Sequence, residues 1–136
     1  MSGGAPRTGG CLCGAVRYRV GAPLRPTLTA CHCSQCRRQH GALGVFTAAP
    51  AAAVEIEGED KLRWYRSSAA AERGFCSVCG SKLFWREIGG ENLDFAAGSL
   101  DETTGLRLSS HIYVASQGDY YEIGGNLPKF PGSGRG

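Results

Sequence analysis

The stretch ACHCSQCRR, residues 30–38, places three cysteines within six positions, at Cys31, Cys33 and Cys36. The other four cysteines form two close pairs, Cys11 with Cys13 in CLCG and Cys76 with Cys79 in CSVCG. Thiols grouped at such short spacing are typical of metal sites and improbable as unrelated buried side chains. The spacing therefore predicts that the chain binds metal ions through sulfur.

The two close pairs have spacings that suit two ligands of one ion. Residues i and i+2 of an extended segment project to the same side, so Cys11 and Cys13 can reach a common ion. Cys76 and Cys79 have the CxxC spacing of a metal knuckle, and Gly80 favours the tight turn of such a knuckle. A redox-active CxxC is the main alternative, but this pair follows no βαβ pattern and precedes no evident helix.

Spacing alone allows two divisions of the seven thiols. A zinc-ribbon division groups Cys33 and Cys36 with Cys76 and Cys79 and leaves three thiols over. A second division joins the two close pairs in a closed four-thiolate site, and the triplet in residues 31–36 becomes a separate three-thiolate site. The second division has a chemical merit, because four protein ligands saturate a structural zinc ion, whereas three leave a position open to substrate.

Length and composition indicate one domain that is rich in turns. The chain has 136 residues, enough for one core and too few for a second. Its 21 glycines and six prolines favour turns over long helices. The net charge of +3 is mild and the basic residues are dispersed, which argues against nucleic-acid binding.

The sequence carries no pattern of a secretory or membrane protein. MSGGAPRTGG, residues 1–10, lacks the apolar region of a secretory signal, and the longest uncharged stretch, residues 39–54, is interrupted by Gly and Pro. Many cysteines without such a signal suggest a reducing compartment, and an odd count excludes complete disulfide pairing. We therefore expect a cytoplasmic protein.

Alternating apolar and polar residues predict short strands along much of the chain. AVRYRV places Val16, Tyr18 and Val20 on one face and two arginines on the other. The same pattern predicts further inward pairs: Val54 and Ile56, Leu62 and Trp64, Leu83 and Trp85, and Ile112 and Val114. Trp64, Trp85 and Phe84 are expected in the core.

One short helix is expected in SQCRRQHG, with Ser34 as its N-cap and Gly41 at its end. Residues 1–9 are expected to form a flexible N-terminus and residues 131–136 a flexible tail. The sequence thus predicts a mainly β domain with little helix.

Five segments together are similar to a known family: GGCLCGAVRYRV, CHCSQCRRQHG, RGFCSVCGSKLFW, AAGSLD, and HIYV followed by NLPKF. They resemble the glutathione-dependent formaldehyde-activating family, which includes centromere protein V, over residues 10–130. The resemblance implies a small single-domain β-tent of packed antiparallel sheets with two zinc sites.

The resemblance also implies the ligands of each zinc ion. The CxC of the first strand and the late CxxC share a structural zinc in that family, which implies Cys11, Cys13, Cys76 and Cys79 as its ligands here. The triplet holds a second zinc with an open position, which implies Cys31, Cys33 and Cys36 as metal ligands and catalytic residues. The resemblance therefore favours the second division.

The activity implied is that of a carbon–sulfur lyase, S-(hydroxymethyl)glutathione synthase. A small-molecule thiol such as glutathione would take the open zinc position and add to formaldehyde or a similar small aldehyde. A non-catalytic zinc module, in which both ions only support an interaction or scaffold fold, is the alternative. Nucleic-acid and membrane partners are not expected.

The arginines that follow the triplet and the three histidines of the chain are expected to have different roles. Arg37 and Arg38 are candidates to offset the negative charge of three thiolates or to bind a glutathione carboxylate. His32 projects away from the ligands on either side of it, so we expect it to pack beside them without binding the ion. His40 is expected at the surface or as a polar residue at the helix end, and His111 is expected to be structural at the start of a strand.

The closing segment differs from the family pattern. Members often have Asp-Gly-Leu-Pro where this chain has Gly125, Asn126, Leu127 and Pro128. Tyr120 and Tyr121 precede this segment and are candidates to line a substrate pocket.

Overall fold

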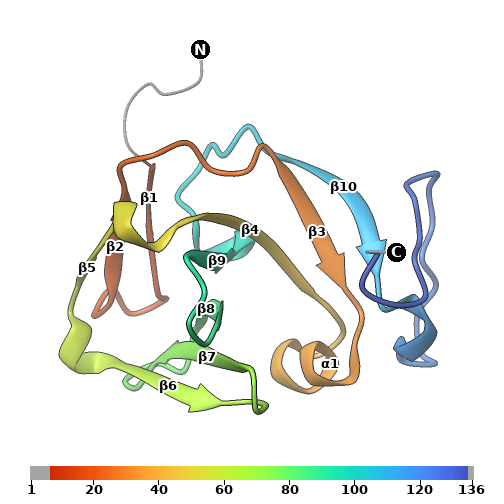
Figure 1. Cartoon of the computed structure of the whole chain (residues 1–136), viewed down its shortest axis with the longest axis horizontal. Helices are drawn as coiled ribbons and strands as arrows, with labels where there is room; N and C mark the ends of the chain where they lie inside the picture. The colour runs from red at the N-terminus through yellow and green to blue at the C-terminus, as the bar shows by residue number, and fades with distance from the viewer. Residues whose placement is uncertain (1–6, 135–136) are drawn as a thin grey trace.

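The computed structural model describes residues 7–134, which contain ten strands and one α-helix (Figure 1). The strands are β1 (Arg7–Gly10), β2 (Arg17–Val20), β3 (Thr27–Cys31), β4 (Gly44–Pro50), β5 (Val54–Glu57), β6 (Leu62–Arg66), β7 (Ala71–Cys76), β8 (Lys82–Glu87), β9 (Asn92–Ala96) and β10 (Arg107–Ile112). The helix is α1 (Ser34–His40), and single 3-10 turns are η1 (Ala51–Ala53), η2 (Glu59–Lys61), η3 (Ala97–Ser99) and η4 (Val114–Ser116).

The strands form two sheets, as expected for a mainly β domain. The smaller sheet has the order β1-β2-β5, and the larger has the order β10-β3-β4-β9-β8-β7-β6. Neighbouring strands are antiparallel except β10 and β3, which are parallel. Parallel neighbours need a long crossover and not a hairpin, and here most of the chain lies between β3 and β10. The predicted mainly β class is confirmed, with this one departure from antiparallel pairing.

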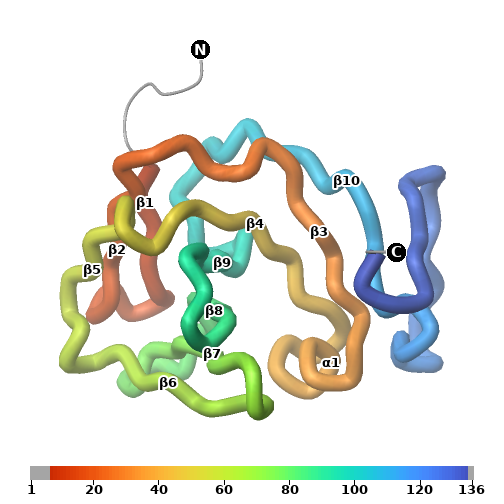
Figure 2. Tube along the Cα trace, in the orientation of Figure 1, coloured from red at the N-terminus to blue at the C-terminus, as the bar shows by residue number. Residues whose placement is uncertain are grey.

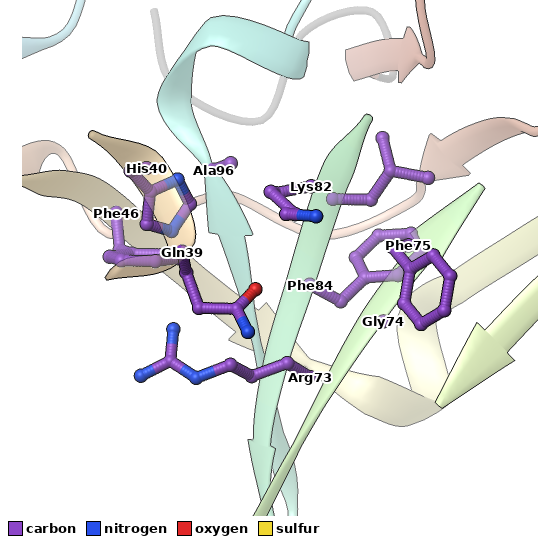
Figure 3. Close-up of a pocket in the computed structure, with 10 residues that line it drawn as sticks. Gln39, His40, Phe46, Arg73, Gly74, Phe75, Lys82, Phe84 and Ala96 are labelled. Atoms are coloured by element: carbon purple, nitrogen blue, oxygen red, sulfur yellow. The ribbon is translucent and has the colours of Figure 1, made fainter. Parts of the chain in front are cut away.

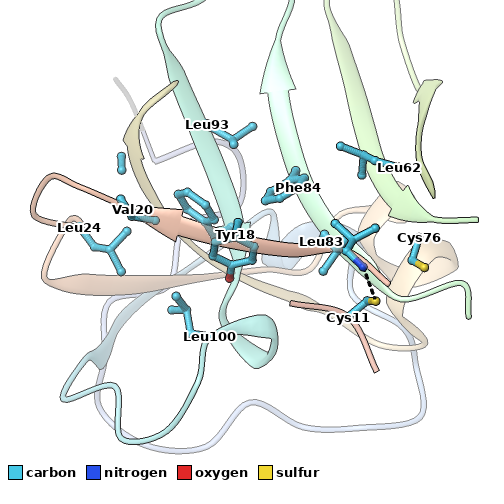
Figure 4. Close-up of a cluster of buried hydrophobic side chains, with 13 residues drawn as sticks. Cys11, Tyr18, Val20, Leu24, Leu62, Cys76, Leu83, Phe84, Leu93 and Leu100 are labelled. Atoms are coloured by element: carbon cyan, nitrogen blue, oxygen red, sulfur yellow. Dashed lines mark hydrogen bonds between the residues drawn. The ribbon is translucent and has the colours of Figure 1, made fainter. Parts of the chain in front are cut away.

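The core lies between the two sheets (Figure 4). The ring of Tyr18 on β2 lies 5.3 Å from the ring of Phe84 on β8 and 5.0 Å from that of Phe95 on β9. Cys11 and Cys76 belong to the same buried cluster and lie at one end of it. Burial of these side chains provides the main apolar stabilisation of the fold.

The two faces of the large sheet have different roles. Residues directly opposite each other on neighbouring strands project to the same face. Phe84 lies opposite Phe95, and both are buried in the core. Arg73, Trp85 and Asp94 form a row across β7, β8 and β9, because Arg73 pairs with Trp85 and Trp85 with Asp94. This row lies on the face away from the core.

The strand β8 corrects one prediction from the alternating pattern. Leu83 and Trp85 were expected to point inward together, but Leu83 and Phe84 are the buried residues. The register with β7 shifts between Gly74 and Phe75, which leaves Leu83 without a direct partner. Such a bulge turns the strand and breaks the alternation, so Trp85 faces away from the core.

The other predicted strands differ in detail. Tyr18 and Val20 are buried as expected, whereas Val54, Ile56 and Trp64 are only partly buried against the core. The prediction for the end of β10 is wrong. The strand stops at Ile112, Tyr113 takes a left-handed conformation with φ 56°, and Val114 begins η4.

The helix α1 occurs where it was predicted but begins with a different cap. Cys33, not Ser34, is the N-cap, and its sulfur accepts a hydrogen bond from the backbone N–H of Cys36. Gly41 ends the helix in a left-handed conformation with φ 97°, as predicted.

The segments near both chain ends form more backbone hydrogen bonds with the rest of the fold than the sequence predicted. Residues 7–9, expected within a flexible N-terminus, belong to β1, and residues 1–6 lie outside the described residues. The segment around Lys129 lies beside β10 (Figure 2), where His111 and Lys129 form a parallel bridge and Tyr113 N–H donates to Gly132 O at 2.8 Å. Residues 135 and 136 of the expected tail also lie outside the described residues. In residues 7–134, no helix has the length and apolar character needed to cross a membrane.

Candidate metal centres

The seven cysteine sulfurs gather in two clusters. The four-cysteine cluster contains Cys11, Cys13, Cys76 and Cys79, and the three-cysteine cluster contains Cys31, Cys33 and Cys36. Within each cluster all sulfur atoms lie within 4.8 Å of one another. This grouping corresponds to the second division of the thiols, and the zinc-ribbon division, which would combine Cys36 with Cys76, does not match the geometry.

Sulfur spacing in the four-cysteine cluster suits a tetrahedral ion. The sulfur atoms of Cys11 and Cys13 are 3.7 Å apart, and those of Cys13 and Cys76 are 3.9 Å apart. Four sulfurs at the Zn–S distance of about 2.3 Å in a regular tetrahedron are about 3.8 Å from one another. These four residues therefore can hold a zinc-sized ion without rearrangement of the backbone.

Two turns from different sheets bring these four sulfurs together. Cys76 ends β7, and Gly80 closes the turn with φ 80° and an N–H that donates to Cys76 O at 2.8 Å. The left-handed conformation favours glycine, as the sequence indicated. Cys11 and Cys13 lie in a turn after β1, where Gly14 N–H donates to Cys11 O, and not in the extended segment that was expected.

Backbone amides of these turns point at the sulfur atoms. Val16 N–H donates to Cys11 Sγ at 3.3 Å, and Val78 N–H donates to Cys76 Sγ at 3.3 Å. The Ser81 hydroxyl lies 3.1 Å from Cys79 Sγ, and its hydrogen bond lowers the pKa of Cys79 to about 5. Hydrogen bonds of this kind favour the thiolate form that metal ions bind.

The three-cysteine cluster is built by one strand and the helix that follows. Cys31 is the last residue of β3, Cys33 is the N-cap of α1, and Cys36 lies in the first turn of that helix. Hydrogen bonds from the thiols of Cys31 and Cys36 lower the pKa of Cys33, whereas hydrogen bonds to Cys33 and Cys36 raise the pKa of Cys31. Three crowded sulfurs cannot all ionise readily unless a cation offsets their charge. The cluster thus has the donor set and the charge demand of a metal site.

A large groove opens beside the three-cysteine cluster. Its volume is about 610 Å³, and all three cysteines line it. The exposed face of the large sheet forms part of its lining through Arg73, Trp85 and Asp94, which make the row described above. Cavities of about 300–1,000 Å³ are typical of small-molecule sites.

Arg73 is a groove residue that the sequence did not single out. Its side chain is 7% exposed, and its Nη1 and Nη2 lie 4.0 and 3.9 Å from Cys36 Sγ. Nη2 also donates to Gln35 Oε1 at 3.3 Å. A single arginine in a strand is usually interpreted as solvent-exposed. The only signal for Arg73 in the sequence was its place at the start of the segment RGFCSVCG.

Arg37 and Arg38, the cations suggested by the sequence, do not line the groove. Both lie on α1 after Cys36, where Arg37 is partly buried and Arg38 is exposed. The helix turns their side chains away from the cluster, because residues one and two positions apart do not share a helix face. Arg73, which comes from β7, takes the place beside the sulfur.

His32 lies in a buried chain of polar side chains and is not a member of either cysteine cluster. Its Nδ1 is 2.6 Å from the Tyr121 hydroxyl, and its Nε2 is 2.9 Å from His111 Nδ1. Burial lowers the pKa of both histidines and raises that of Tyr121, so the surroundings disfavour the charged form of each side chain. His111 lies next to the end of β10, not at a strand start as expected.

His40 is partly buried beside a small cavity of about 10 Å³, which Arg73 also lines (Figure 3). His40 is the last residue of α1, which agrees with the expected helix-end position, and its ring packs on Phe46 with centroids 5.5 Å apart. Burial lowers the pKa of His40. The cavity has room for about one water molecule.

Tyr120 and Tyr121, suggested as pocket residues, form hydrogen bonds with the segment that follows α1. The Tyr120 hydroxyl donates to Gly41 O at 2.6 Å, and the Tyr121 hydroxyl bonds with His32 as described. Neither is among the residues that line the groove. The 125–128 segment is likewise absent from that lining, whereas Phe130 contributes to it.

Comparisons with known proteins give a consistent result. The family model described as glutathione-dependent formaldehyde-activating enzyme matches residues 6–116. A Halomonas elongata protein named for the same enzyme is 34% identical, and the match covers 59% of this chain and 59% of the relative. A Schizosaccharomyces pombe protein named as an uncharacterized lyase is 25% identical, over 90% of this chain and 88% of the relative.

A solved structure shares the fold. The crystal structure of a Rhodobacter sphaeroides protein matches with a TM-score of 0.60 and 24% identity, over 71% of this chain and 89% of that chain. The family model spans both cysteine clusters and most of the chain. The chain therefore belongs to the family of glutathione-dependent formaldehyde-activating enzymes.

Proposed function

We propose that this protein is a zinc-dependent carbon–sulfur lyase that joins formaldehyde, or a similar small aldehyde, to glutathione or another thiol. The observation that carries the proposal is the unequal ligand number of the two clusters. Four sulfurs gather in one cluster and three in the other, and only the cluster of three lines the large groove. A closed ligand set is typical of a structural ion and an incomplete set of a catalytic one.

The cysteines have separate roles in this proposal. Cys11, Cys13, Cys76 and Cys79 hold a structural zinc ion that ties the small sheet to the large one. Cys31, Cys33 and Cys36 hold a second zinc ion and are the residues that carry the chemistry. When bound there, zinc supplies a Lewis-acid position that favours the thiolate form of a substrate thiol.

The proposed reaction is a simple addition. The substrate sulfur forms a bond to the carbonyl carbon of the aldehyde, and the thiol proton ends on the carbonyl oxygen. The product is a hydroxymethyl thioether, and the reverse reaction breaks the same carbon–sulfur bond. The groove contributes by holding the thiol compound and the aldehyde next to each other, since orientation of two reactants lowers the barrier to their combination.

The groove supports a small polar substrate. Its lining combines the charged side chains of Arg25, Arg73 and Asp94 with the aromatic ring of Trp85. Such a mixture suits a thiol compound that carries both carboxylate and ammonium groups, as glutathione does. A non-catalytic module would need no groove at an incomplete ligand set.

The test combines metal analysis with an exchange measurement on the native protein and a Cys36→Ser variant. We expect two zinc ions per native chain and one in the variant, with the circular dichroism spectrum unchanged. Carbon-13 NMR should show enzyme-accelerated exchange between formaldehyde and its glutathione adduct in the native protein and none in the variant.

The outcomes separate the parts of the proposal. One zinc ion in the native protein would contradict the two-site assignment. Two zinc ions with no acceleration of exchange by the native protein would instead favour the non-catalytic module. Unchanged exchange in Cys36→Ser would remove the three-cysteine cluster from the chemistry.

A further inference from the structure

We propose that Arg73 makes the three-cysteine site selective for an anionic fourth ligand, a thiolate, over a neutral one. The inference rests on the proposed metal site but not on the proposed lyase activity. Arg73 acts here as a positioning and specificity-determining residue, because it lies beside a ligand sulfur at the groove wall. No other basic residue among those described in positions 7–134 is in hydrogen-bond contact with a cysteine sulfur.

Burial of Arg73 requires a counter-charge. A guanidinium that is 7% exposed has lost most of its hydration, which is unfavourable unless an anion compensates it. Within residues 7–134, the three ion pairs are Arg17–Asp101, Lys61–Asp60 and Arg86–Glu72, so Arg73 has no carboxylate partner there. The thiolates of the cluster are therefore the negative charge that this side chain faces.

The hydrogen bonds of Arg73 leave capacity for a ligand. Its terminal nitrogens contact Cys36 Sγ and Gln35 Oε1, and its Nε is buried without a partner. Five N–H groups in a planar fork exceed what two acceptors can satisfy. Because Arg73 also lines the groove, its side chain lies beside the space that a ligand of the cluster would enter.

Charge counting indicates what Arg73 changes. Three thiolates and one Zn²⁺ have a net charge of about −1, and a thiolate as fourth ligand makes it about −2. The nearby cation brings these totals to about 0 and −1. A neutral fourth ligand gains much less from the same cation, because it adds no charge to the site.

Other charged groups in the groove do not take this role. Arg25 is held by hydrogen bonds to the backbone oxygens of Thr27 and Phe46, away from the sulfurs. Asp94 lies in the same row as Arg73 but two strands away, which corresponds to about 10 Å. Arg73 is thus the groove cation that shares contacts with the ligand set.

The experiment uses the full chain loaded with Co²⁺, whose visible absorption reports the ligands of each site. Glutathione and imidazole are titrated separately at neutral pH into the native protein, Arg73→Met and Arg73→Lys. We expect Arg73→Met to weaken glutathione binding about tenfold or more and imidazole binding less than about twofold. Arg73→Lys should retain most of the affinity for glutathione, since it keeps the charge.

Arg63→Met is the matched control, because Arg63 is exposed on β6 and does not line the groove. It should bind both ligands as the native protein does. Folding of each variant is checked by the Co²⁺ spectrum of the four-cysteine cluster, which should not change.

Three results would overturn the proposal. These are equal weakening of both ligands in Arg73→Met, unchanged glutathione affinity in that variant, and loss of the second Co²⁺ ion in both Arg73 variants. The last would mean that the shape of the arginine, not its charge, maintains the site. A native protein that binds glutathione but accelerates no exchange would contradict the proposed activity and leave the role of Arg73 standing.

Discussion

Cys76 and Cys36 are both almost fully buried, but their sulfur atoms face different surroundings. Cys76 accepts hydrogen bonds from the backbone N–H groups of Val78 and Cys79, in its own turn. Cys36 lies beside the guanidinium of Arg73, which comes from a distant part of the sequence. Fixed backbone dipoles suit a site that never changes its ligands, whereas a side-chain cation can respond to a ligand that enters and leaves.

The clusters also differ in what they hold together. The four-cysteine cluster joins the turn after β1, in the small sheet, to the end of β7 in the large one. The three-cysteine cluster lies within a single segment of six residues, residues 31–36, and the strand and helix that carry it are positioned by other contacts. Loss of the first should therefore affect the fold, and loss of the second the chemistry.

The largest effect is expected from Cys76→Ser. A structural zinc site can contribute about 10–16 kcal/mol of apparent binding free energy, which is comparable to the whole stability of a domain at about 5–15 kcal/mol. The variant should show no cooperative thermal unfolding, as measured by circular dichroism. Ser77→Ala, an exposed neighbour, is the control and should unfold as the native protein does. A cooperative transition at the native temperature in Cys76→Ser would show that this cluster does not support the fold.

Two substitutions at Cys33 separate its metal-binding role from its capping role. Both Cys33→Ser and Cys33→Ala should lose one metal ion and the accelerated exchange, and both should remain folded. Serine can replace the sulfur as the N-cap acceptor of α1, whereas alanine cannot, so alanine should be less stable by about 1 kcal/mol. Urea unfolding of the two variants measures this difference. Equal stability of the two would mean that the cap contact at Cys33 has no energetic value.

Acid should weaken the side of the molecule near the three-cysteine cluster first. Burial lowers the pKa of His32 and His111 in the folded protein, so their contribution to stability is complete above the unfolded pKa of about 6.5. It is lost as the pH falls from there through the folded pKa. The unfolding temperature of the native protein should thus fall between pH 7 and pH 5 more than that of His111→Gln. If the unfolding temperatures of the native protein and His111→Gln fell by the same amount between pH 7 and pH 5, this role of His32 and His111 would be contradicted.

The smallest effect is expected from Asp101→Asn, on the side of the small sheet. Hydrogen bonds from Arg17 and Thr8 lower the pKa of Asp101, so its contribution is present above the unfolded pKa of about 3.9 and lost as the pH falls through the folded value. The partners are largely exposed, so the loss at neutral pH should be at most about 1 kcal/mol. Urea unfolding at pH 7 and pH 3 measures the difference in unfolding free energy between the native protein and Asp101→Asn. A larger difference at pH 3 than at pH 7 would contradict the expected sign. Glu59→Gln, outside this ion pair, serves as the control.

Much of the fold could be predicted from local patterns, and the failures have identifiable causes. The alternation in AVRYRV predicted the inward positions of Tyr18 and Val20, which need no knowledge of the partner strand. The strands β3, β4, β7 and β9 were not predicted. They lie in the middle of the large sheet with neighbours on both sides, where glycine, alanine and polar residues are accommodated by the pairing itself.

The cysteines that gather at the candidate site were predictable, but the surroundings of the site were not. Cysteine spacing identified every thiol of both clusters, because a short segment can bring its own ligands to one ion. Arg73 was not singled out, and Trp85 was expected in the core. Both reach the groove only through the register of β7 with β8 and a bulge in that pairing. Register depends on long-range packing that a local pattern does not contain.

The sequence by itself determined that this chain has cysteine-rich segments with the spacing of metal ligands, short alternating strands and one helix that starts at the triplet. These are local properties, set by residue spacing of two to five positions. Residue spacing left the grouping of the cysteines open and only the family resemblance favoured one division. The tertiary structure brings Cys11 and Cys76 together, since they are 65 positions apart and meet only when the small sheet packs on the large one. It also decided that a cation lies beside Cys36, because pairing of β3 with β4, β4 with β9 and β9 with β8 places Arg73 of β7 in the same sheet as the strand that precedes the helix.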